Sequence, residues 1–173
     1  MSYRLDTPLR IAQVLGITLS SFWAGATVSI STFLIPHLIS APSSQAVTSW
    51  ARMFNLGKFM APPISLAAAT SFGYIAYSLP TNTPNRDKVF WRYVTAAVFS
   101  GAVPFYTATF MQSTNGALLR EAAKVAGEGG GKAVGTIGEA GVSELLRKWS
   151  VLNNLRGSLL IISAGIGAWT ALV

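Results

Sequence analysis

Four long apolar stretches without charged side chains dominate the chain. No Asp, Glu, Lys or Arg occurs within residues 11–51, 59–85, 93–119 or 157–173. A helix needs about 20 apolar residues to cross the roughly 30 Å hydrocarbon core of a bilayer. The pattern therefore predicts four membrane-crossing helices, at about residues 10–36, 59–79, 90–112 and 152–173.

The segments between these stretches predict how the helices are joined. Residues 113–151 are expected to form one long loop between the third and fourth helices, with short amphipathic helices and a glycine-rich linker at 127–138. Prolines are expected to end the first helix at Pro36 and the second at Pro80, to start the second at Pro62–Pro63, and to kink the third at Pro104. Small residues at four-residue spacing predict close helix approaches at Gly16/Ser20, Gly25/Ser29 and Ser163/Gly167. The expected fold is an all-α, integral membrane four-helix bundle that forms a single domain over residues 1–173.

Composition strengthens this interpretation and removes several other classes of protein. Charged residues make up 11% of the chain, against about 25% in soluble domains. The net charge of +7 arises from basic residues that flank the apolar runs, where they meet lipid headgroups; we therefore expect no nucleic-acid partner. The chain has no cysteine and one histidine, so we expect no disulfide and no metal centre. The first apolar run is too long for a signal sequence and predicts a membrane helix.

Polar and aromatic side chains gather at one predicted mouth of the bundle. With four crossings, the 37–58 and 113–152 segments lie on the same side of the membrane. That side receives His37, Trp50, Asn55, Lys58, Tyr106, Thr107, Asn115, Trp149, Asn153 and Arg156. We therefore expect any ligand site at this mouth.

Each of these side chains also has a purely structural explanation. Trp149, Asn153 and Arg156 stand at i, i+4 and i+7 and share one helix face, but a Trp and an Arg there are equally typical of interfacial anchors. His37 follows a proline at a helix end and is either a capped polar residue or a base. Tyr106 and Thr107 either border a pocket or satisfy carbonyls that Pro104 frees. Asn115 is typical of a helix end.

Three motifs in register resemble one family of small membrane proteins. The segment Trp149-Ser-Val-Leu-Asn-Asn-Leu-Arg156 resembles the Trp-x3-Asn-x2-Arg signature that opens the last helix of the anthrone oxygenase-like proteins. Residues 44–63, with Trp50, Asn55 and Lys58, are similar to the family's first loop and second helix. Residues 104–118, Pro-Phe-Tyr-Thr followed by Met111 and Thr-Asn115, are similar to its third helix, although Ser113 replaces a frequent proline.

The resemblance implies a membrane oxygenase that converts an anthrone to an anthraquinone with O₂ as co-substrate and no other cofactor. Aromatic side chains would then stack on a flat aromatic substrate, and Asn153 and Arg156 would hold the oxygen that gains charge. His37 would be the base, because an imidazole exchanges protons near neutral pH. The implied substrate-binding residues are Trp50, Asn55, Lys58, Phe105, Tyr106, Thr107, Met111, Asn115 and Trp149.

Two other classes of function fit the same sequence. A non-catalytic scaffold, or a lipid- or quinone-binding protein, needs the helices and basic flanks but no reactive side chain. A channel or transporter is disfavoured because the apolar runs contain no acidic residue. The expected location is multi-pass in a membrane, with the endoplasmic reticulum as the candidate compartment and the site facing the cytosol by the positive-inside rule.

Overall fold

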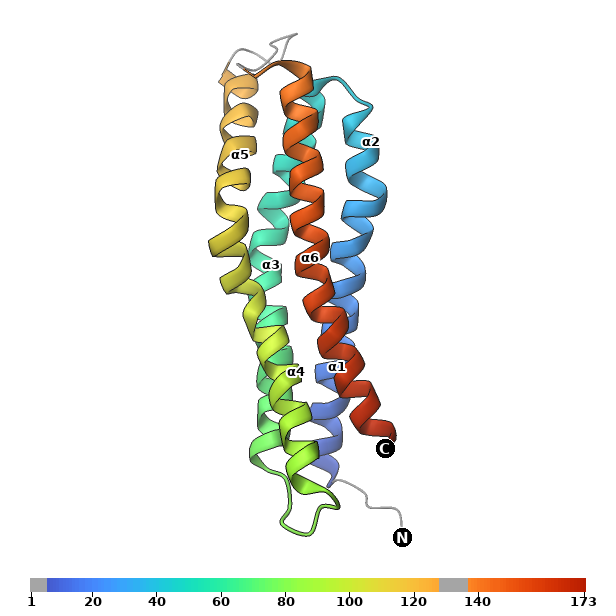
Figure 1. The fold of residues 1–173 in the computed structure, drawn as a ribbon. Helices are drawn as coiled ribbons and strands as arrows, with labels where there is room; N and C mark the ends of the chain where they lie inside the picture. The colour runs from blue at the N-terminus through green and yellow to red at the C-terminus, as the bar shows by residue number, and fades with distance from the viewer. Residues whose placement is uncertain (1–5, 128–136) are drawn as a thin grey trace. The chain divides into compact units, whose positions relative to one another are not determined.

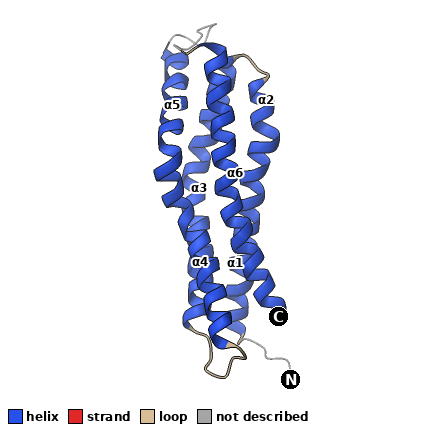
Figure 2. Cartoon of the chain, viewed as in Figure 1, coloured by secondary structure: helices blue, strands red, loops and turns tan. Residues whose placement is uncertain are grey.

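The described part of the chain is built from helices. The computed structural model describes residues 6–127 and 137–173, and every regular element in those ranges is an α-helix or a π-helix (Figures 1 and 2). In chain order they are α1 (Thr7–Ser29), η1 (Ile30–Leu34), α2 (Ile35–Ile39), α3 (Ser43–Tyr77), α4 (Arg86–Tyr106), η2 (Thr107–Met111), α5 (Gln112–Gly127) and α6 (Gly138–Leu172), where η marks a π-helix. The predicted all-α class is confirmed.

Within residues 6–127 and 137–173, four continuous helical stretches are long and apolar enough to cross a membrane. They cover Thr7–Ile39, Ser43–Tyr77, Arg86–Gly127 and Gly138–Leu172. The first joins α1, η1 and α2 without a break, and the third joins α4, η2 and α5 in the same way. The predicted number and order of membrane helices are therefore confirmed.

The polar segments next to the apolar runs belong to long continuous helices, where the sequence predicts connecting segments with only short amphipathic helices. α3 begins at Ser43 rather than near residue 59, and α5 and α6 occupy most of the residues 113–151 expected to form the long loop. These segments are amphipathic: in α6, Val142, Leu146 and Trp149 are buried on one face, while the charged residues between them remain outside. The charges that favoured a loop belong to the outer face of a helix. Most of the predicted glycine-rich linker, residues 128–136, lies outside the described residues.

Two of the predicted proline boundaries differ in the structure. Pro62 and Pro63 lie inside α3 rather than in its first turn, and the helix continues past Pro36 to Ile39. Pro36 follows η1 directly within a continuous helix, so its missing N–H group leaves a carbonyl of the preceding turn without its backbone donor. Membrane helices tolerate internal prolines when other groups satisfy the freed backbone atoms. Pro104 lies inside α4, as predicted.

The described residues form two compact units. Unit 1 contains the residues up to Gly25 together with Ala61–Phe105 and Gly157–Val173, and unit 2 contains Ala26–Met60 and Tyr106–Arg156. Both α3 and α6 contribute residues to each unit. The expectation of a single domain stays a prediction.

A phenylalanine fills the space beside two glycines in unit 1. A Cβ atom at Gly16 of α1 would lie 2.8 Å from the Phe72 ring, and one at Gly167 of α6 would lie 2.6 Å from it. Phe72 itself is fully buried. These two glycines are therefore required for close packing, as predicted. The predicted approach at Gly25/Ser29 is wrong within this chain, because a Cβ at Gly25 meets nothing within 4 Å and Ser29 is exposed.

Three serines connect α1, α4 and α6 in the interior of unit 1. The Ser100 hydroxyl lies 3.1 Å from that of Ser20 and 2.7 Å from that of Ser163. Ser163 also donates to the Ala96 carbonyl at 2.7 Å. All three hydroxyls are therefore satisfied although their residues are fully buried. In Figure 1 the start of α1, the turn between α3 and α4, and the end of α6 lie at the same end of unit 1, in agreement with the predicted crossing count.

Candidate functional site

A row of polar side chains on α6 meets two π-helical turns in unit 2. Ser150, Asn153 and Arg156 stand at i, i+3 and i+6 and share one face of the helix. The first two contact Ser31 of η1 and, for Asn153, also Thr27 near the end of α1, whereas Arg156 contacts Thr107 in η2. This row and the two π-helices form the candidate site.

The π-helical turn η1 makes backbone oxygens available to α6. In η1 the backbone bonds span five residues, as in Ile35 N–H to Ile30 oxygen, and such π-bulges disturb the regular α-helical pairing. The Ser150 hydroxyl donates to the Ser31 carbonyl at 3.2 Å, and an Asn153 amide N–H donates to the Thr27 carbonyl at 2.8 Å. The α6 side chains therefore supply bonds that the irregular helix needs.

Asn153 is fully buried and uses both ends of its amide. Its nitrogen donates to the Thr27 carbonyl and to the Ser31 hydroxyl, each at 2.8 Å. Its oxygen accepts a bond from Arg156 Nη2 at 2.6 Å. An amide nitrogen carries two hydrogens, so no hydrogen is left for a ligand. In this arrangement Asn153 positions Arg156 and joins α6 to η1.

Arg156 has neutral partners only. Besides Asn153, its Nη1 lies 3.4 Å from the Thr107 hydroxyl. Its Nε is buried and has no hydrogen-bond partner, and no acidic residue pairs with it anywhere in the described ranges. A buried charge is costly without an opposite charge or a full set of hydrogen bonds. The guanidinium is therefore a site where an anion would be stabilised.

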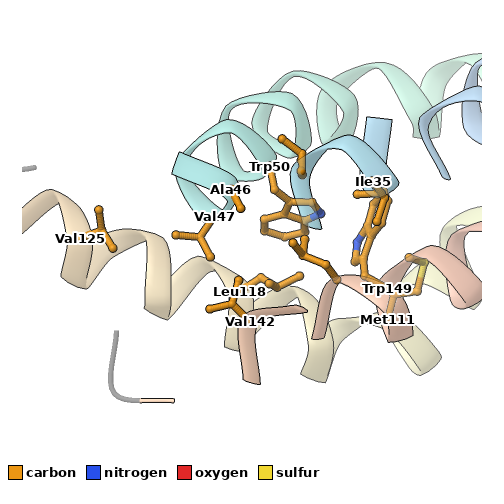
Figure 3. Packing of buried hydrophobic residues seen from close by; sticks show 11 residues of the cluster. Ile35, Ala46, Val47, Trp50, Met111, Leu118, Val125, Val142 and Trp149 are labelled. Atoms are coloured by element: carbon orange, nitrogen blue, oxygen red, sulfur yellow. The ribbon is translucent and has the colours of Figure 1, made fainter. Parts of the chain in front are cut away.

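An aromatic cluster adjoins this site in unit 2. Trp50 of α3 and Trp149 of α6 (Figure 3) meet edge to face with ring centroids 5.7 Å apart. Phe54 stacks on Trp50 at 4.9 Å. Trp149 Nε1 donates to Asn115 Oδ1 at 2.9 Å. The structure thus brings together three predicted residues from α3, α5 and α6. It also covers both indole rings, since Trp50 is fully buried and Trp149 is 2% exposed.

Two more predicted residues belong to this neighbourhood. Met111 is buried in the same cluster as the two tryptophans. The Tyr106 hydroxyl is close enough to Arg156 for an electrostatic interaction, and the Tyr106 ring lies 5.1 Å from that of Phe110. Tyr106 and Thr107 therefore lie beside the Arg156 guanidinium, whereas Met111 packs with the aromatic cluster.

Four predicted residues belong neither to the aromatic cluster nor to the partners of the guanidinium. His37 is exposed at the end of α2, and Asn55 and Lys58 are exposed on α3, with the Lys58 ammonium 5.1 Å from the centroid of the Phe59 ring. Phe105 is 73% exposed and belongs to unit 1. Their roles stay predictions. The described residues contain no group of three or more His, Cys, Asp or Glu that could hold a metal ion, and the expected absence of a metal also stays a prediction.

The sequence analysis missed three residues that hold the site together. Thr27, Ser31 and Ser150 each bond across the contact between α6 and the first helical stretch. The available signal was the Ser31 hydroxyl in an apolar run, whereas Thr27 takes part through its backbone carbonyl and Ser150 lies in the segment predicted as a loop. A Ser or Thr in a membrane helix usually bonds to its own backbone, so the sequence alone gives no reason to pair Ser31 with α6.

Asn153→Ala is expected to lower both stability and turnover. It leaves the Thr27 carbonyl and the Ser31 hydroxyl without their buried partner, which should cost about 2–3 kcal/mol. Turnover should fall by about tenfold because Arg156 loses the acceptor that orients it. Asn154→Ala is the matched control, since the neighbouring residue is exposed. Thermal unfolding in detergent and turnover measure the two effects; a large loss of turnover at unchanged stability would instead indicate that Asn153 contacts substrate.

Trp149→Phe is expected to destabilise unit 2 by about 1–2 kcal/mol. The substitution keeps an aromatic ring against Trp50 but removes the N–H group that satisfies Asn115, which is only 7% exposed. Trp169→Phe is the control, because Trp169 is 58% exposed. Equal unfolding temperatures for the two variants would show that the Trp149–Asn115 bond contributes nothing.

The fold and the site together define a class of protein. It is a helical protein whose described residues form four membrane-length helices, in which an arginine with neutral partners lies beside an aromatic cluster. Comparison with known proteins identifies the family: the family described as anthrone oxygenase matches residues 50–166, and the chain belongs to it. The matched range includes every predicted site residue except His37.

Curated relatives that match most of the chain are named anthrone oxygenase or monooxygenase. An anthrone oxygenase of Claviceps purpurea is 28% identical over 90% of this chain and 85% of its own length. An anthrone oxygenase of Aspergillus fumigatus is 29% identical over 94% of this chain and 93% of its own length. A monooxygenase of Dothistroma septosporum is 30% identical, covering 90% and 80% respectively. No solved structure shows a significant match.

Proposed function

We propose that this protein oxidises the central methylene carbon of an anthrone-type aromatic polyketide to the carbonyl of an anthraquinone, with O₂ as co-substrate. The observation that carries the proposal is the Arg156 guanidinium, whose partners are neutral and whose buried Nε has no acceptor. Membership in the anthrone oxygenase family and the names of the relatives support the substrate class.

The chemistry requires an anion to be stabilised. Loss of a proton from the methylene carbon converts the neutral anthrone to a fully aromatic anthrolate, with negative charge on the oxygen across the central ring. The anthrolate adds O₂ at the methylene carbon to give, after protonation, a hydroperoxide. Cleavage of the O–O bond with loss of the second hydrogen then gives the quinone carbonyl and water. One oxygen atom of O₂ enters the product and the other leaves as water.

Arg156 is the group proposed to hold the anthrolate oxygen. A positioned donor aimed at an oxygen that gains charge lowers the barrier most when water is excluded. The Nε–H group, which has no acceptor in the structure, supplies the donor. Asn153 and Thr107 accept bonds from the two terminal nitrogens of the guanidinium and hold it in place. Tyr106 and Thr107 line the approach to the guanidinium in this proposal, and the covered Trp50 and Trp149 support the wall behind it.

The proposed reaction draws its electrons from the substrate. Conversion of a methylene to a carbonyl releases four electrons. One O₂ molecule takes up the same number when both of its oxygen atoms are reduced to the oxidation level of water. The proposal therefore needs no electron-carrying cofactor. An apolar membrane protein also suits the co-substrate and a flat aromatic substrate, because both partition into lipid. We propose that the protein crosses the membrane several times and that this membrane is the endoplasmic reticulum.

Oxygen uptake by the purified protein tests this proposal. Metal-stripped protein in detergent is given a polyhydroxylated anthrone, and the autoxidation rate without protein is subtracted. We expect one O₂ consumed for each quinone formed and one ¹⁸O atom in each quinone from ¹⁸O₂. A rate that returns only with added metal would overturn the cofactor-free mechanism. No rate above background with several anthrones would favour the non-catalytic binding protein.

His37→Gln in the same assay addresses the proton transfer. If the His37 imidazole removes the methylene proton, this variant loses turnover to a degree comparable with loss of Arg156. Because His37 is exposed and lies outside the range that matches the family, we expect a smaller loss. A near-complete loss in folded protein would restore His37 as the base.

A further inference from the structure

A groove on unit 1 combines cationic and aromatic side chains at one end of the helices. It has a volume of about 530 Å³ and lies between the first turns of α4 and the last turns of α6. α4 contributes Lys88, Trp91, Arg92 and Thr95, and α6 contributes Gly165 and Trp169. The α4 residues stand at i, i+3, i+4 and i+7, so they form one face. The volume falls within the range of ligand sites, about 300–1,000 Å³.

The groove runs from a charged end to an apolar end. The bond from the Ser163 hydroxyl to the Ala96 carbonyl fixes the antiparallel register of the two helices. In that register Lys88 lies near the end of α6, whereas Thr95 lies across from Gly165. A Cβ atom at Gly165 would meet nothing within 4 Å, so the groove is open beside Gly165. Positive charge at one end and an open apolar channel at the other are complementary to an amphiphilic anion.

The two cations of the groove are available to an external anion. Among the residues that the structure describes, neither Lys88 nor Arg92 takes part in an ion pair, and no acidic side chain lines the groove. Arg92 stands immediately before the charge-free stretch 93–119 and Lys88 one helical turn earlier, which places both at headgroup level in a membrane. Trp91 and Trp169 are 62% and 58% exposed, as is typical of side chains in the interfacial aromatic belt.

We propose that this groove binds one anionic phospholipid. Its phosphate lies between Lys88 and Arg92, which donate to the phosphate oxygens. One acyl chain passes between the two tryptophans and follows the channel over Thr95 and Gly165. The site lies in unit 1 and is independent of the proposed oxidation chemistry.

Native mass spectrometry of the full chain in detergent, titrated with phosphatidylglycerol, tests the proposal. We expect one lipid to bind more tightly than the rest. Lys88→Gln/Arg92→Gln should weaken this lipid about 30-fold, from about fivefold for each basic side chain. Gly165→Leu should weaken it without changing the charge, because the new side chain fills the channel. Arg10→Gln is the matched control, since Arg10 is an exposed basic residue in unit 1.

Each other outcome would overturn the proposal. Equal weakening by Arg10→Gln would mean that net charge alone attracts lipid. If glycerol phosphate displaces the lipid completely, the site binds only the phosphate and no acyl chain. The same conclusion follows if Gly165→Leu has no effect in folded protein. Equal affinity for phosphatidylcholine would show that the cations do not select an anionic headgroup. Circular dichroism confirms that each variant is folded.

Discussion

Arg156→Gln should reduce the proposed anthrone oxidation by at least about 100-fold while leaving the fold intact, as expected when a positioned donor to an oxyanion is lost. Glutamine can still donate to Asn153 Oδ1 and Thr107, so the local hydrogen bonds are largely kept. What it removes is the positive charge and the Nε–H group, which has no acceptor in the structure. The loss should therefore fall on kcat rather than on KM, because the neutral substrate makes little use of the charge before it loses its proton.

Two further variants identify the cause of this loss. Arg147→Gln removes an exposed arginine from the same helix and should leave turnover unchanged. Arg156→Lys keeps the charge but loses the planar fork, so we expect a rate between those of wild type and Arg156→Gln. Unchanged turnover in Arg156→Gln, or an equal loss in Arg147→Gln, would rule out the anion-binding role.

Gly16→Leu should destabilise the protein by about 3 kcal/mol or more, near the upper end of overpacking effects. Even the first added carbon lies 2.8 Å from the Phe72 ring, and Phe72 is fully buried between α1 and α6. The ring cannot turn away freely because Gly167 confines it from the other side at 2.6 Å. Thermal unfolding in detergent, followed by circular dichroism, measures the effect.

Gly25→Leu is the matched control on the same helix, because a Cβ there meets nothing within 4 Å. It should be neutral or slightly stabilising, since glycine is a poor helix former. Phe72→Ala should rescue part of the loss in Gly16→Leu, because the leucine then fills the vacated space and the two effects are not additive. Equal unfolding temperatures for Gly16→Leu and Gly25→Leu would contradict the packing described for Phe72.

The sequence was sufficient for the helices but not for their ends. The charge-free stretches identify four crossings because charge is costly in a bilayer, and all four helices are present. The same reasoning ends each membrane helix at a charged segment, so it predicts only short amphipathic helices within a loop where α5 and the first half of α6 continue the membrane helices. An amphipathic helix that packs on others through Leu118 or Leu146 can carry charge on its outer face.

The candidate site was predictable only in part, for a reason of geometry. Spacing alone places Asn153 and Arg156 on one helix face, and both lie there. The partners of Asn153 follow from the π-helical turn η1, which brings Ser31 and the Thr27 carbonyl to α6. Nothing in the local sequence distinguishes a π-helical turn from an α-helical one at this position. The role of Asn153 therefore changes from a proposed substrate donor to a group that positions Arg156.

The two π-helices also have a consequence for how relatives of this chain align. An α-helix turns by about 100° per residue, so one residue removed from η1 would rotate every later side chain of that helix by this angle. Ile35 and Leu38, both buried in unit 2, would then leave the core unless the π-helical turn became α-helical at the same time. A relative with a single-residue gap between positions 30 and 34, or between 107 and 111, can thus keep both flanking helix faces. Gaps of one residue are compatible with this fold at those two places, whereas elsewhere in the same helices they would turn the buried face outward.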